Sequence, residues 1–310
     1  MAGNLRIGTR GSELALWQTR HVKSLLEGRY PNIVIVVLTM KTTGDKILDA
    51  PLAKIGDKGL FTKELEVALL DDRIDLAVHS CKDVPTVVPE GLTISTILER
   101  EDVRDVFIAH PLKPHRSFTA LPHHAAVATG SLRRKCQILH ARPDILTTEI
   151  RGNLNTRLKK LEESEWDGMI LAKAGVTRLG MTRYITEILP LELMLPAVGQ
   201  GALAIEIRSG DARTAEFLRP LQHMPTAIAI NAERALLRHL EGGCQIPIGA
   251  YGYPVGNELR LDAVIGSLDG RHIIRGTKSG PLSNVDRIGI DLAKELLTRG
   301  GKEILDEIRK

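Results

Sequence analysis

Aromatic residues are scarce in this chain of 310 residues, because phenylalanine, tryptophan and tyrosine together make up only 3% of it. Surfaces that bind single-stranded nucleic acid usually stack bases on aromatic rings, so the scarcity argues against such a surface. The formal net charge of +4 is too small to indicate a general binder of nucleic acids. We therefore expect no nucleic-acid partner.

Cysteines are also few, and the three present, Cys81, Cys136 and Cys244, lie far apart without C-x-x-C spacing. This pattern indicates neither a disulfide framework nor a zinc site. No apolar run approaches the length of a membrane-spanning helix, and residues 1–7 lack the apolar core of a signal peptide. We expect a monomeric protein of the reducing cytoplasm, with no membrane contact and no metal.

The glycines do not form a nucleotide-binding motif. No G-x-x-x-x-G-K-[ST] pattern occurs, and Gly8, Gly11, Gly56 and Gly59 do not have dinucleotide-binding spacing. His79 precedes Ser80, but no Ser-His-Asp arrangement can be identified, and a single histidine beside a serine is most often structural.

Short apolar runs alternate with helical patterns over the first two thirds of the chain. A chain of this length usually forms two or three domains, and this alternation predicts βαβ units with largely parallel sheets. The β-branched run Ile33 to Leu38 predicts a buried strand. The other predicted strands are residues 5–8, 74–78, 92–98, 106–109, 125–129, 145–150, 168–172 and 202–207. Helices are predicted near residues 12–26, 61–70, 131–140 and 153–163.

A third region begins near Pro225. Residues 227–240 and 286–299 have helical patterns, and residues 259–265 and 272–277 predict a pair of strands. In open α/β sheets, ligands bind beyond the carboxyl ends of the strands. A crevice between two α/β domains is therefore the expected site.

Arginine outnumbers lysine by 26 to 16, and several arginines follow predicted strands. In Thr129-Gly130-Ser131-Leu132-Arg133-Arg134, a strand end leads into a helix whose free amides attract anions. Two arginines at a helix amino terminus oppose the helix dipole unless an anion binds there. The alternative is a simple N-cap at Ser131 with solvated arginines.

Further arginines stand at equivalent places. Arg151 and Arg157 flank Asn153 at another strand end, Arg10 follows the first strand, and Arg178 follows the 168–172 strand. Arginine forks suit paired recognition of carboxylates, so the set indicates a polyanionic ligand.

A carboxylate follows the 74–78 strand. Pro85 disfavours helix at the residue before it and so holds Asp83 on a turn, beside Lys82. This pattern is compatible with a functional carboxylate in a cleft and equally with an aspartate that caps a turn.

Cys244 lies on a loop between Gly242-Gly243 and Pro247, where no regular helix or strand continues easily. On the loop alone it could be a nucleophile, a metal ligand, an attachment point or a small buried residue.

Taken together, these segments resemble the porphobilinogen deaminases (hydroxymethylbilane synthases), in order and over essentially the whole chain. The matching runs are Gly8-Thr9-Arg10-Gly11-Ser12, Lys58-Gly59-Leu60-Phe61, Val78-His79-Ser80-Cys81-Lys82-Asp83-Val84-Pro85, Gly130-Ser131-Leu132-Arg133-Arg134, Ile150-Arg151-Gly152-Asn153, Pro196-Ala197-Val198-Gly199-Gln200-Gly201 and Glu241-Gly242-Gly243-Cys244-Gln245-Ile246-Pro247.

The resemblance implies an enzyme that condenses four porphobilinogen molecules, with loss of ammonia, into the linear tetrapyrrole hydroxymethylbilane. It implies a dipyrromethane cofactor attached through Cys244, with Asp83 as the catalytic carboxylate. Lys82, Thr129, Ser131, Arg133, Arg134 and Gln200 match cofactor contacts. Arg10, Ser12, Arg151, Arg157 and Arg178 match substrate contacts.

The implied fold is α/β, with two similar doubly wound domains that resemble periplasmic binding proteins and flank a cleft, plus a smaller α+β carboxyl-terminal domain. The expected boundaries are residues 1–99 with 200–218, residues 103–195, and residues 222–310.

Three residues depart from the family pattern. Gly130 stands where serine is common, so a hydroxyl contact is expected to be lost or replaced by a backbone amide. Cys81 replaces a common methionine, which we interpret as a packing change. Lys173 adds a charge after a strand and is a candidate anion contact.

Two other functions stay open from the residues alone. A non-enzymatic two-domain anion-binding protein would explain the arginines and the crevice, but not a placed thiol on a third region. A cysteine-dependent acyl transferase would explain the thiol, but no histidine partner for it can be identified.

Overall fold

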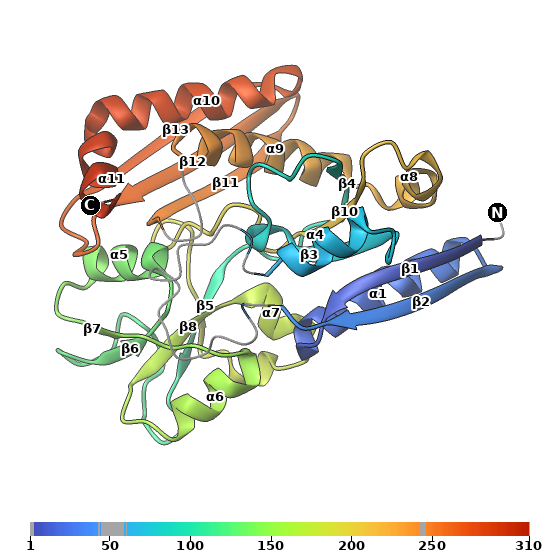
Figure 1. Ribbon diagram of the computed structural model, residues 1–310. Coiled ribbons are helices and arrows are strands. Elements are labelled where there is room, and N and C mark those ends of the chain that lie inside the picture. The colour runs from blue at the N-terminus through green and yellow to red at the C-terminus, as the bar shows by residue number, and fades with distance from the viewer. Residues whose placement is uncertain (1–2, 43, 45–58, 60, 242–245, 310) are drawn as a thin grey trace. The chain divides into compact units, whose positions relative to one another are not determined.

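The computed structural model describes residues 3–42, 44, 59, 61–241 and 246–309. They form two compact units (Figure 1). The first unit takes its described residues from within 3–44, 59–101 and 201–227, and the second from 102–200 and 228–309. Cys244 lies outside the described residues.

Sheet A is the centre of the first unit. Its strand order is β2-β1-β3-β10-β4, and β10 is antiparallel to both of its neighbours. The strands are β1 (Gly3–Arg10), β2 (Ile33–Met40), β3 (Leu76–Ser80), β4 (Leu92–Ile97) and β10 (Leu203–Arg208). The strand expected at residues 202–207 is thus confirmed as β10. It lies between β3 and β4, although both of these strands come much earlier in the chain.

Helices pack on both faces of sheet A. Along β3, Leu76 and Val78 pack with α1 (Glu13–Arg29) and α8 (Ala212–Leu218), whereas Ala77 packs with α4 (Lys63–Leu70) on the other face. The alternation follows from the two-residue period of a strand. This arrangement confirms the predicted α/β class.

The prediction that residues 33–38 form a strand is correct, but the prediction that it is buried is wrong. β2 is an edge strand, with Val34 58% exposed and Val36 48% exposed. A continuous apolar run does not show whether both faces of a strand are covered, and on β2 only the face with Ile33 and Ile35 packs against the core.

Sheet B lies in the second unit and has the order β7-β6-β8-β5-β9. Its strands are β5 (Asp105–Ala109), β6 (Ala126–Ala128), β7 (Leu146–Thr148), β8 (Gly168–Ala172) and β9 (Glu187–Ile188). The helices α5 (Leu132–Ala141), α6 (Leu154–Glu162) and α7 (Lys173–Arg178) follow β6, β7 and β8 respectively. α5 packs on one face of the sheet, and α6 and α7 pack on the other.

Sheets A and B have the same topology. In each, three parallel strands are followed by an antiparallel fourth strand and then by an edge strand parallel to the first three. The antiparallel strand is β10 in sheet A and β5 in sheet B. The carboxyl ends of the parallel strands and the start of the antiparallel strand therefore share one edge in each sheet.

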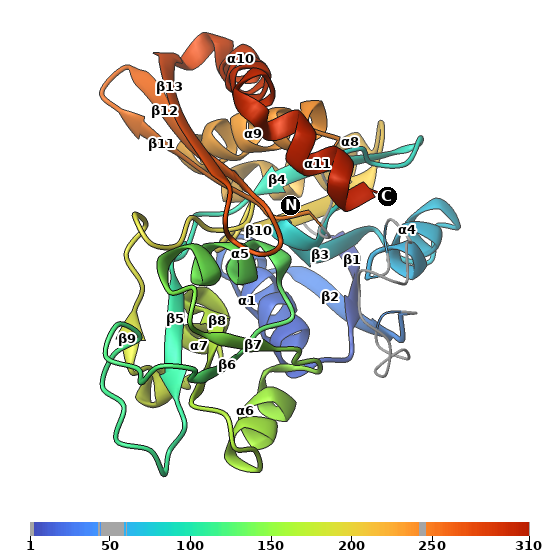
Figure 2. The same cartoon turned by 90° about the vertical axis from the view of Figure 1, so that its left-hand side faces the viewer.

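Sheet C, also in the second unit, is an antiparallel meander of β11 (Ile248–Val255), β12 (Glu258–Gly266) and β13 (Ile273–Pro281). Its helices are α9 (Met224–His239), α10 (Val285–Leu296) and α11 (Lys302–Arg309), and the chain kinks between the last two at Gly300, whose φ of 105° is not helical. Figure 2 shows α9 and α10 on one side of this sheet, where both contribute to its apolar core.

The sequence patterns missed β11, because its glycines and Pro254 are typical of loops. A Cβ atom at Gly249 would lie 2.9 Å from the Leu195 carbonyl oxygen, and one at Gly252 would lie 2.9 Å from the Ala229 carbonyl oxygen. These glycines therefore serve close backbone packing, and the proline is tolerated because β11 is an edge strand.

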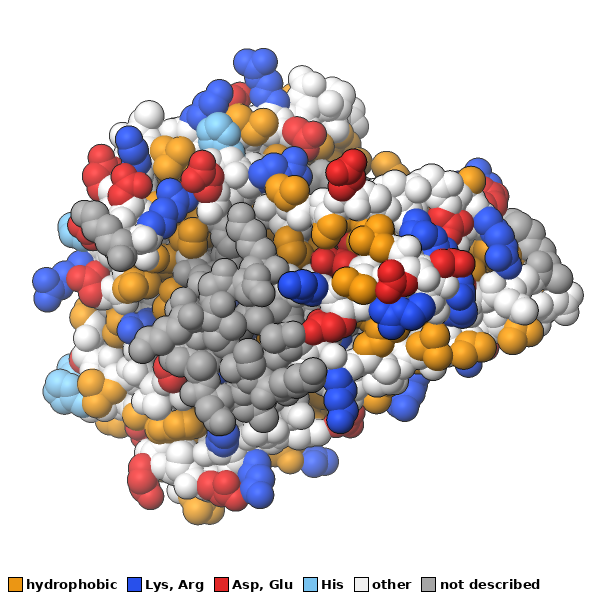
Figure 3. Space-filling model, viewed as in Figure 1, with side chains coloured by type: hydrophobic (Ala, Val, Ile, Leu, Met, Phe, Trp, Pro, Cys, Tyr) orange, Lys and Arg blue, Asp and Glu red, His pale blue; other side chains and the backbone are white. Residues whose placement is uncertain are grey.

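Charges are mixed on the surface that Figure 3 shows, where lysine and arginine side chains alternate with aspartate and glutamate. Among the described residues, no helix is both long enough and apolar enough to cross a membrane.

Candidate functional site

The predicted catalytic carboxylate lies on a single 3-10 turn, η1 (Cys81–Asp83), directly after β3. The amide of Cys81 donates to the carbonyl oxygen of Ala202 at 3.0 Å, and the amide of Val84 donates to the carbonyl oxygen of Cys81 at 3.2 Å. Val84 is extended, with φ −84° and ψ 125°, as its position before a proline requires. Asp83 is therefore half-buried on a turn held by backbone hydrogen bonds at each end.

The end of β1 lies at the same edge of sheet A. The guanidinium carbon of Arg10 is 4.2 Å from the centroid of the Phe61 ring, a cation–π contact. The hydroxyl oxygen of Ser12 accepts a hydrogen bond from the amide of Ala15 at 3.3 Å and caps α1. Since a hydroxyl group also carries a proton, Ser12 can cap the helix and still donate to an anion.

A buried ionisable cluster supports this edge from within. Nε2 of His79 lies 3.0 Å from Oε2 of Glu206, and both side chains are buried. Burial, helped by the nearby charge of Glu206, raises the pKa of Glu66. The interpretation of His79 as a structural residue agrees with this geometry. Sequence patterns did not identify the two glutamates, because their pairing depends on β10 lying beside β3.

At the edge of sheet B, hydroxyl groups shape the start of α5. The hydroxyl oxygen of Thr129 accepts a hydrogen bond from the amide of Ser131 at 3.2 Å. The hydroxyl oxygen of Ser131 accepts one from the amide of Arg134 at 3.4 Å and caps the helix. The N-cap expected at Ser131 is therefore present, and both hydroxyl protons remain suitable donors.

Arg133 and Arg134 are not solvated, since only 4% and 5% of their surfaces are exposed. Both pair with Asp105, the first residue of β5, which is fully buried. Nη1 of Arg133 donates to Oδ2 of Asp105 at 2.8 Å, and Nη2 of Arg134 donates to Oδ1 at 2.8 Å. One carboxylate thus bridges two adjacent arginines.

Gln200 completes this network from the connection before β10. Its side-chain amide donates to Oδ1 of Asp105 at 3.0 Å and to the carbonyl oxygen of Val103 at 2.7 Å. Burial by itself would raise the pKa of Asp105, but the charges of Arg133 and Arg134 outweigh it and lower the pKa to about 2.

The charges of this network do not balance. Within the described part of the chain, Asp105 is the one carboxylate that forms ion pairs with these two arginines. One buried positive charge is therefore left over, and a buried charge is costly unless it has a partner. The arrangement is suited to an anionic ligand.

The remaining predicted arginines belong to the same unit. Nε of Arg157, on α6, donates to the carbonyl oxygen of Gly152 at 2.9 Å. Arg151 lies two residues before Asn153, whose side chain caps α6 by accepting from the amide of Thr156 at 2.9 Å. Arg178, the last residue of α7, is buried with 8% exposure. These arginines follow β7 and β8, whose carboxyl ends share an edge with that of β6.

Steric crowding explains why glycine stands at position 130. A Cβ atom there would lie 2.7 Å from the carbonyl oxygen of Ile150, a distance that side chains essentially never show. A serine in this position would require the backbone after β7 to shift.

The two other departures from the family pattern are at Lys173 and Cys81. Nζ of Lys173 lies 3.2 Å from Oδ2 of Asp102, which Arg104 also contacts at 2.6 Å, so Lys173 takes part in a protein ion pair. Cys81 is 3% exposed, which agrees with its interpretation as a packing residue.

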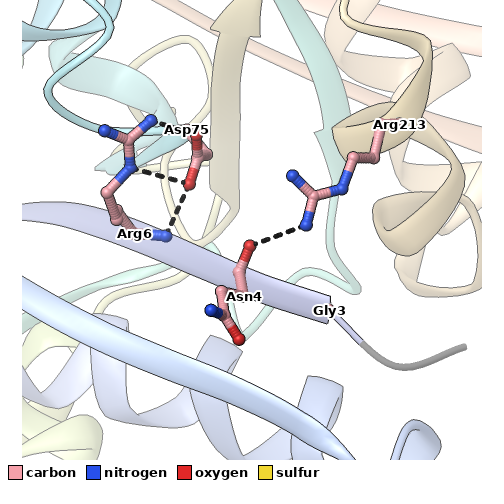
Figure 4. Close-up of a pocket in the computed structure, with 5 residues that line it drawn as sticks. All are labelled: Gly3, Asn4, Arg6, Asp75 and Arg213. Atoms are coloured by element: carbon pink, nitrogen blue, oxygen red, sulfur yellow. Dashed lines mark hydrogen bonds and ion pairs between the residues drawn. The ribbon is translucent and has the colours of Figure 1, made fainter.

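A separate cavity lies near the start of β1 (Figure 4). It is lined by Gly3, Asn4, Arg6, Asp75 and Arg213. Its charged groups already have protein partners, since Arg6 pairs with Asp75 at 2.7 Å and Arg213 donates to the carbonyl oxygen of Asn4 at 3.1 Å. No predicted site residue lines this cavity, and among the described residues no cluster of three or more potential metal ligands occurs.

Comparison with known families identifies the chain. The family described as "Porphobilinogen deaminase, dipyromethane cofactor binding domain" matches residues 5–216, and the family's carboxyl-terminal domain matches residues 227–298. The chain belongs to the porphobilinogen deaminase family. A porphobilinogen deaminase of Carboxydothermus hydrogenoformans is 54% identical over 304 residues, which are 98% of this chain and 97% of that protein. The family membership expected from the ordered motifs is confirmed.

Solved structures of binding proteins are distant. The methionine-binding protein MetQ is 12% identical, with a TM-score of 0.45, over 71% of this chain and 90% of MetQ. The aliphatic sulphonate-binding protein SsuA of Escherichia coli is 18% identical, with a TM-score of 0.39, over 77% of this chain and 70% of SsuA. The α/β assignment rests on the sheets themselves.

Proposed function

We propose that this member of the porphobilinogen deaminase family is a hydroxymethylbilane synthase, a transferase. It condenses four porphobilinogen molecules head to tail, releases ammonia at each step and frees the linear tetrapyrrole by hydrolysis. The observation in the structure that most supports this proposal is the pair of buried arginines that share one carboxylate, because each pyrrole of the substrate carries carboxylate side chains.

The donor groups fit the dipyrromethane cofactor of the family. Arginine forks and hydroxyl donors at the edge of sheet B match its carboxylates, and the uncompensated charge beside Asp105 favours an anion there. When bound, dipyrromethane supplies the free pyrrole carbon to which substrate units are added. The proposed cofactor site is formed by Arg133, Arg134, Thr129, Ser131, Gln200 and Lys82.

Cys244 is the proposed attachment point. The two described cysteines are buried, and burial raises the pKa of the Cys136 thiol to about 12. Since the thiolate is the reactive form, these two thiols are poorly suited to attack an electrophile. Cys244 follows two glycines in a segment that matches the family motif, and a thioether there needs no metal.

The arginines hold and orient the substrate. A guanidinium that binds a carboxylate through two parallel hydrogen bonds fixes the plane of the ring that carries it, and correct orientation lowers the entropic cost of reaction. Arg10, Ser12, Arg151, Arg157 and Arg178 are the proposed substrate contacts, because they lie at the end of β1 or in the segments that follow β1, β7 and β8.

Asp83 is the proposed catalytic residue. Positive charge develops on the pyrrole as ammonia leaves, and a carboxylate near the pyrrole nitrogens stabilises it. At ~4 Å and an effective dielectric constant of about 20, the attraction is roughly 4 kcal/mol, an upper value because desolvation opposes it. In its protonated form the same side chain can transfer a proton to the departing amine, and the carboxylate that remains can then accept one from the ring carbon.

We further propose that the chain forms three domains, at residues 1–99 with 200–218, 103–195 and 222–310. The three separate sheets support this division. We also propose that the protein is a cytoplasmic monomer and has no nucleic-acid partner. The mixed charge on the surface in Figure 3 supports the absence of a nucleic-acid partner.

Intact-mass measurement before and after addition of porphobilinogen tests the function. We expect the purified protein to be heavier than its sequence by two pyrrole units and to give a ladder of further additions. Cys244→Ser should lack the first increment, whereas the matched control Cys136→Ser should keep it.

A wild-type protein without added mass and without turnover would contradict the proposed function and would favour a non-enzymatic anion-binding protein. Full activity of Cys244→Ser without added mass would contradict the attachment alone.

A further inference from the structure

The two arginines bridged by Asp105 are bound in different ways. Arg134 directs three nitrogens inward: Nε and Nη2 contact Oδ1 of Asp105 at 3.2 and 2.8 Å, and Nη1 donates to the carbonyl oxygen of Ile170 at 2.9 Å. Its guanidinium is thereby attached to both β5 and β8. Every nitrogen of this side chain has a protein acceptor.

Arg133 uses a single nitrogen for its protein contacts. Its Nη1 donates to Oδ2 of Asp105 at 2.8 Å and to the carbonyl oxygen of Leu195 at 2.7 Å. Among the described residues, Nε and Nη2 of Arg133 have no hydrogen-bond partner. Neither of these two atoms is fully buried, so both are accessible to a ligand. The Nε–Nη2 edge is the one that binds carboxylates through two parallel hydrogen bonds.

We propose that Asp105 is a positioning residue that gives the two arginines different tasks: it fixes Arg134 inside the protein and orients Arg133 so that its Nε–Nη2 edge binds a carboxylate of the cofactor. This inference deepens the proposed function and rests on it. The inference narrows the proposed cofactor site: Arg133 contacts the carboxylate directly, whereas Arg134, whose nitrogens all have protein acceptors, acts with Asp105 as its support.

The surroundings of Asp105 suit this role. Its side chain is fully buried and accepts hydrogen bonds from Arg133, Arg134 and Gln200, so neither oxygen can turn without losing a partner. Asp105 pairs with Ala172 at the start of the antiparallel strand, where β5 meets the end of β8. The carboxylate therefore lies at the sheet edge that carries the predicted anion contacts.

Arg133→Lys and Arg134→Lys form the matched pair that tests the inference. Each keeps its charge but loses the planar fork, so the change is not conservative where two parallel hydrogen bonds form. For each holoenzyme we would measure the fraction of folded protein that carries the cofactor, by intact mass, together with the melting temperature. We expect Arg133→Lys to lower the loaded fraction about tenfold with little change in melting temperature. Arg134→Lys should lower the melting temperature and leave the loaded fraction of the folded protein within about twofold of wild type.

Asp105→Glu tests positioning, because it keeps the charge and moves the carboxylate by one methylene group. We expect the loaded fraction of folded protein to fall about tenfold while kcat per loaded molecule stays within about threefold, since Arg133 is misplaced and Asp83 is untouched. Asp105→Asn should give a larger loss of loading, and the glutamate variant should partly restore it. If the asparagine variant does not fold, the glutamate variant and the two lysine variants still decide the matter.

Equal loss of loading in the two lysine variants would overturn the inference, as would wild-type loading in Asp105→Glu. A wild-type protein that neither carries the cofactor nor turns over would instead contradict the proposed function, so the two failures are distinguishable.

Discussion

Sheets A and B have one topology but carry different chemistry at equivalent edges. After β3 of sheet A, a short turn presents the half-buried Asp83. After β6 of sheet B, two arginines are buried against Asp105. The first edge presents a negative group that can move protons, and the second holds a surplus of positive charge.

The difference shows that topology determines where functional groups gather but not which groups they are. In both sheets a serine caps the helix that follows the middle one of the three parallel strands, Ser12 for α1 after β1 and Ser131 for α5 after β6. The residues around these shared caps differ, so that one edge presents the carboxyl group of Asp83 and the other buries two arginines against one aspartate.

The largest expected effect is on the rate, at the edge of sheet A. Asp83→Asn should lower kcat up to about a thousandfold, the equivalent of roughly 4 kcal/mol in the barrier, because the developing positive charge loses its carboxylate. The melting temperature should stay near that of wild type, since Asp83 is half-buried on a turn held by backbone hydrogen bonds. Single-turnover kinetics on correctly loaded protein would measure this, and near-normal turnover would exclude Asp83 as the catalytic residue.

The corresponding change at the edge of sheet B should act on stability. Asp105→Asn leaves two buried arginines without a carboxylate and should lower the free energy of unfolding by about 3 kcal/mol. This is the lower end for a broken buried pair, because asparagine can still accept some of the hydrogen bonds. Urea denaturation would measure the change, with Asp83→Asn as the control. Equal free energies of unfolding for the two variants would contradict a stabilising role that is specific to Asp105.

The pH dependence sharpens the same contrast. The folded-state pKa of Asp105, about 2, is below its ordinary value of 3.8, so its stabilisation is complete above about pH 4 and is lost as the pH falls through about 2. The stability difference between wild type and Asp105→Asn should therefore shrink by about 2 kcal/mol over that range. The pKa of Glu66 at sheet A is raised, so its contribution to stability has the opposite pH dependence. That contribution is present in acid and is lost as the pH rises through the raised pKa.

Denaturation of Asp105→Asn and Glu66→Gln at a series of pH values would compare how the two side chains change the free energy of unfolding with pH. Glu66→Gln should gain stability relative to wild type as the pH rises toward neutrality. Parallel pH curves for both variants would rule out the assigned ionisations.

The smallest expected effect is at the shared caps. Ser12→Ala and Ser131→Ala should each cost about 1 kcal/mol, because each removes the acceptor of one helix-terminal amide. Thermal denaturation would measure both, with the exposed Ser24→Ala, within α1, as a control. Costs that differ severalfold would show that the caps are not equivalent.

Much of the fold could be predicted from local patterns. Residues 168–172 form a strand, Ser131 caps a helix, and Val84 is extended before Pro85, as expected. β11 was missed because its glycines serve close packing against Leu195 and Ala229, and this purpose cannot be read from neighbours in sequence.

A candidate site could be proposed from the sequence where residue type and strand ends coincide. Arg133, Arg134 and Asp83 were proposed because charged side chains beyond strand ends are unusual and suit carboxylate chemistry. Asp105 was missed, because it lies at the start of a strand within a charged segment and nothing local indicates its partners. Its importance depends on β5 lying antiparallel beside β8.

The sequence by itself determined the family, the α/β class and the residue types of the chemistry, because ordered motifs and local periodicity are properties of the chain. Only the tertiary structure decided how charges are shared. It buried Arg133 and Arg134 together on Asp105, and it paired His79 with Glu206 across β3 and β10. The physical reason is that the cost of a buried charge depends on the partners around it, and folding brings those partners from distant parts of the chain.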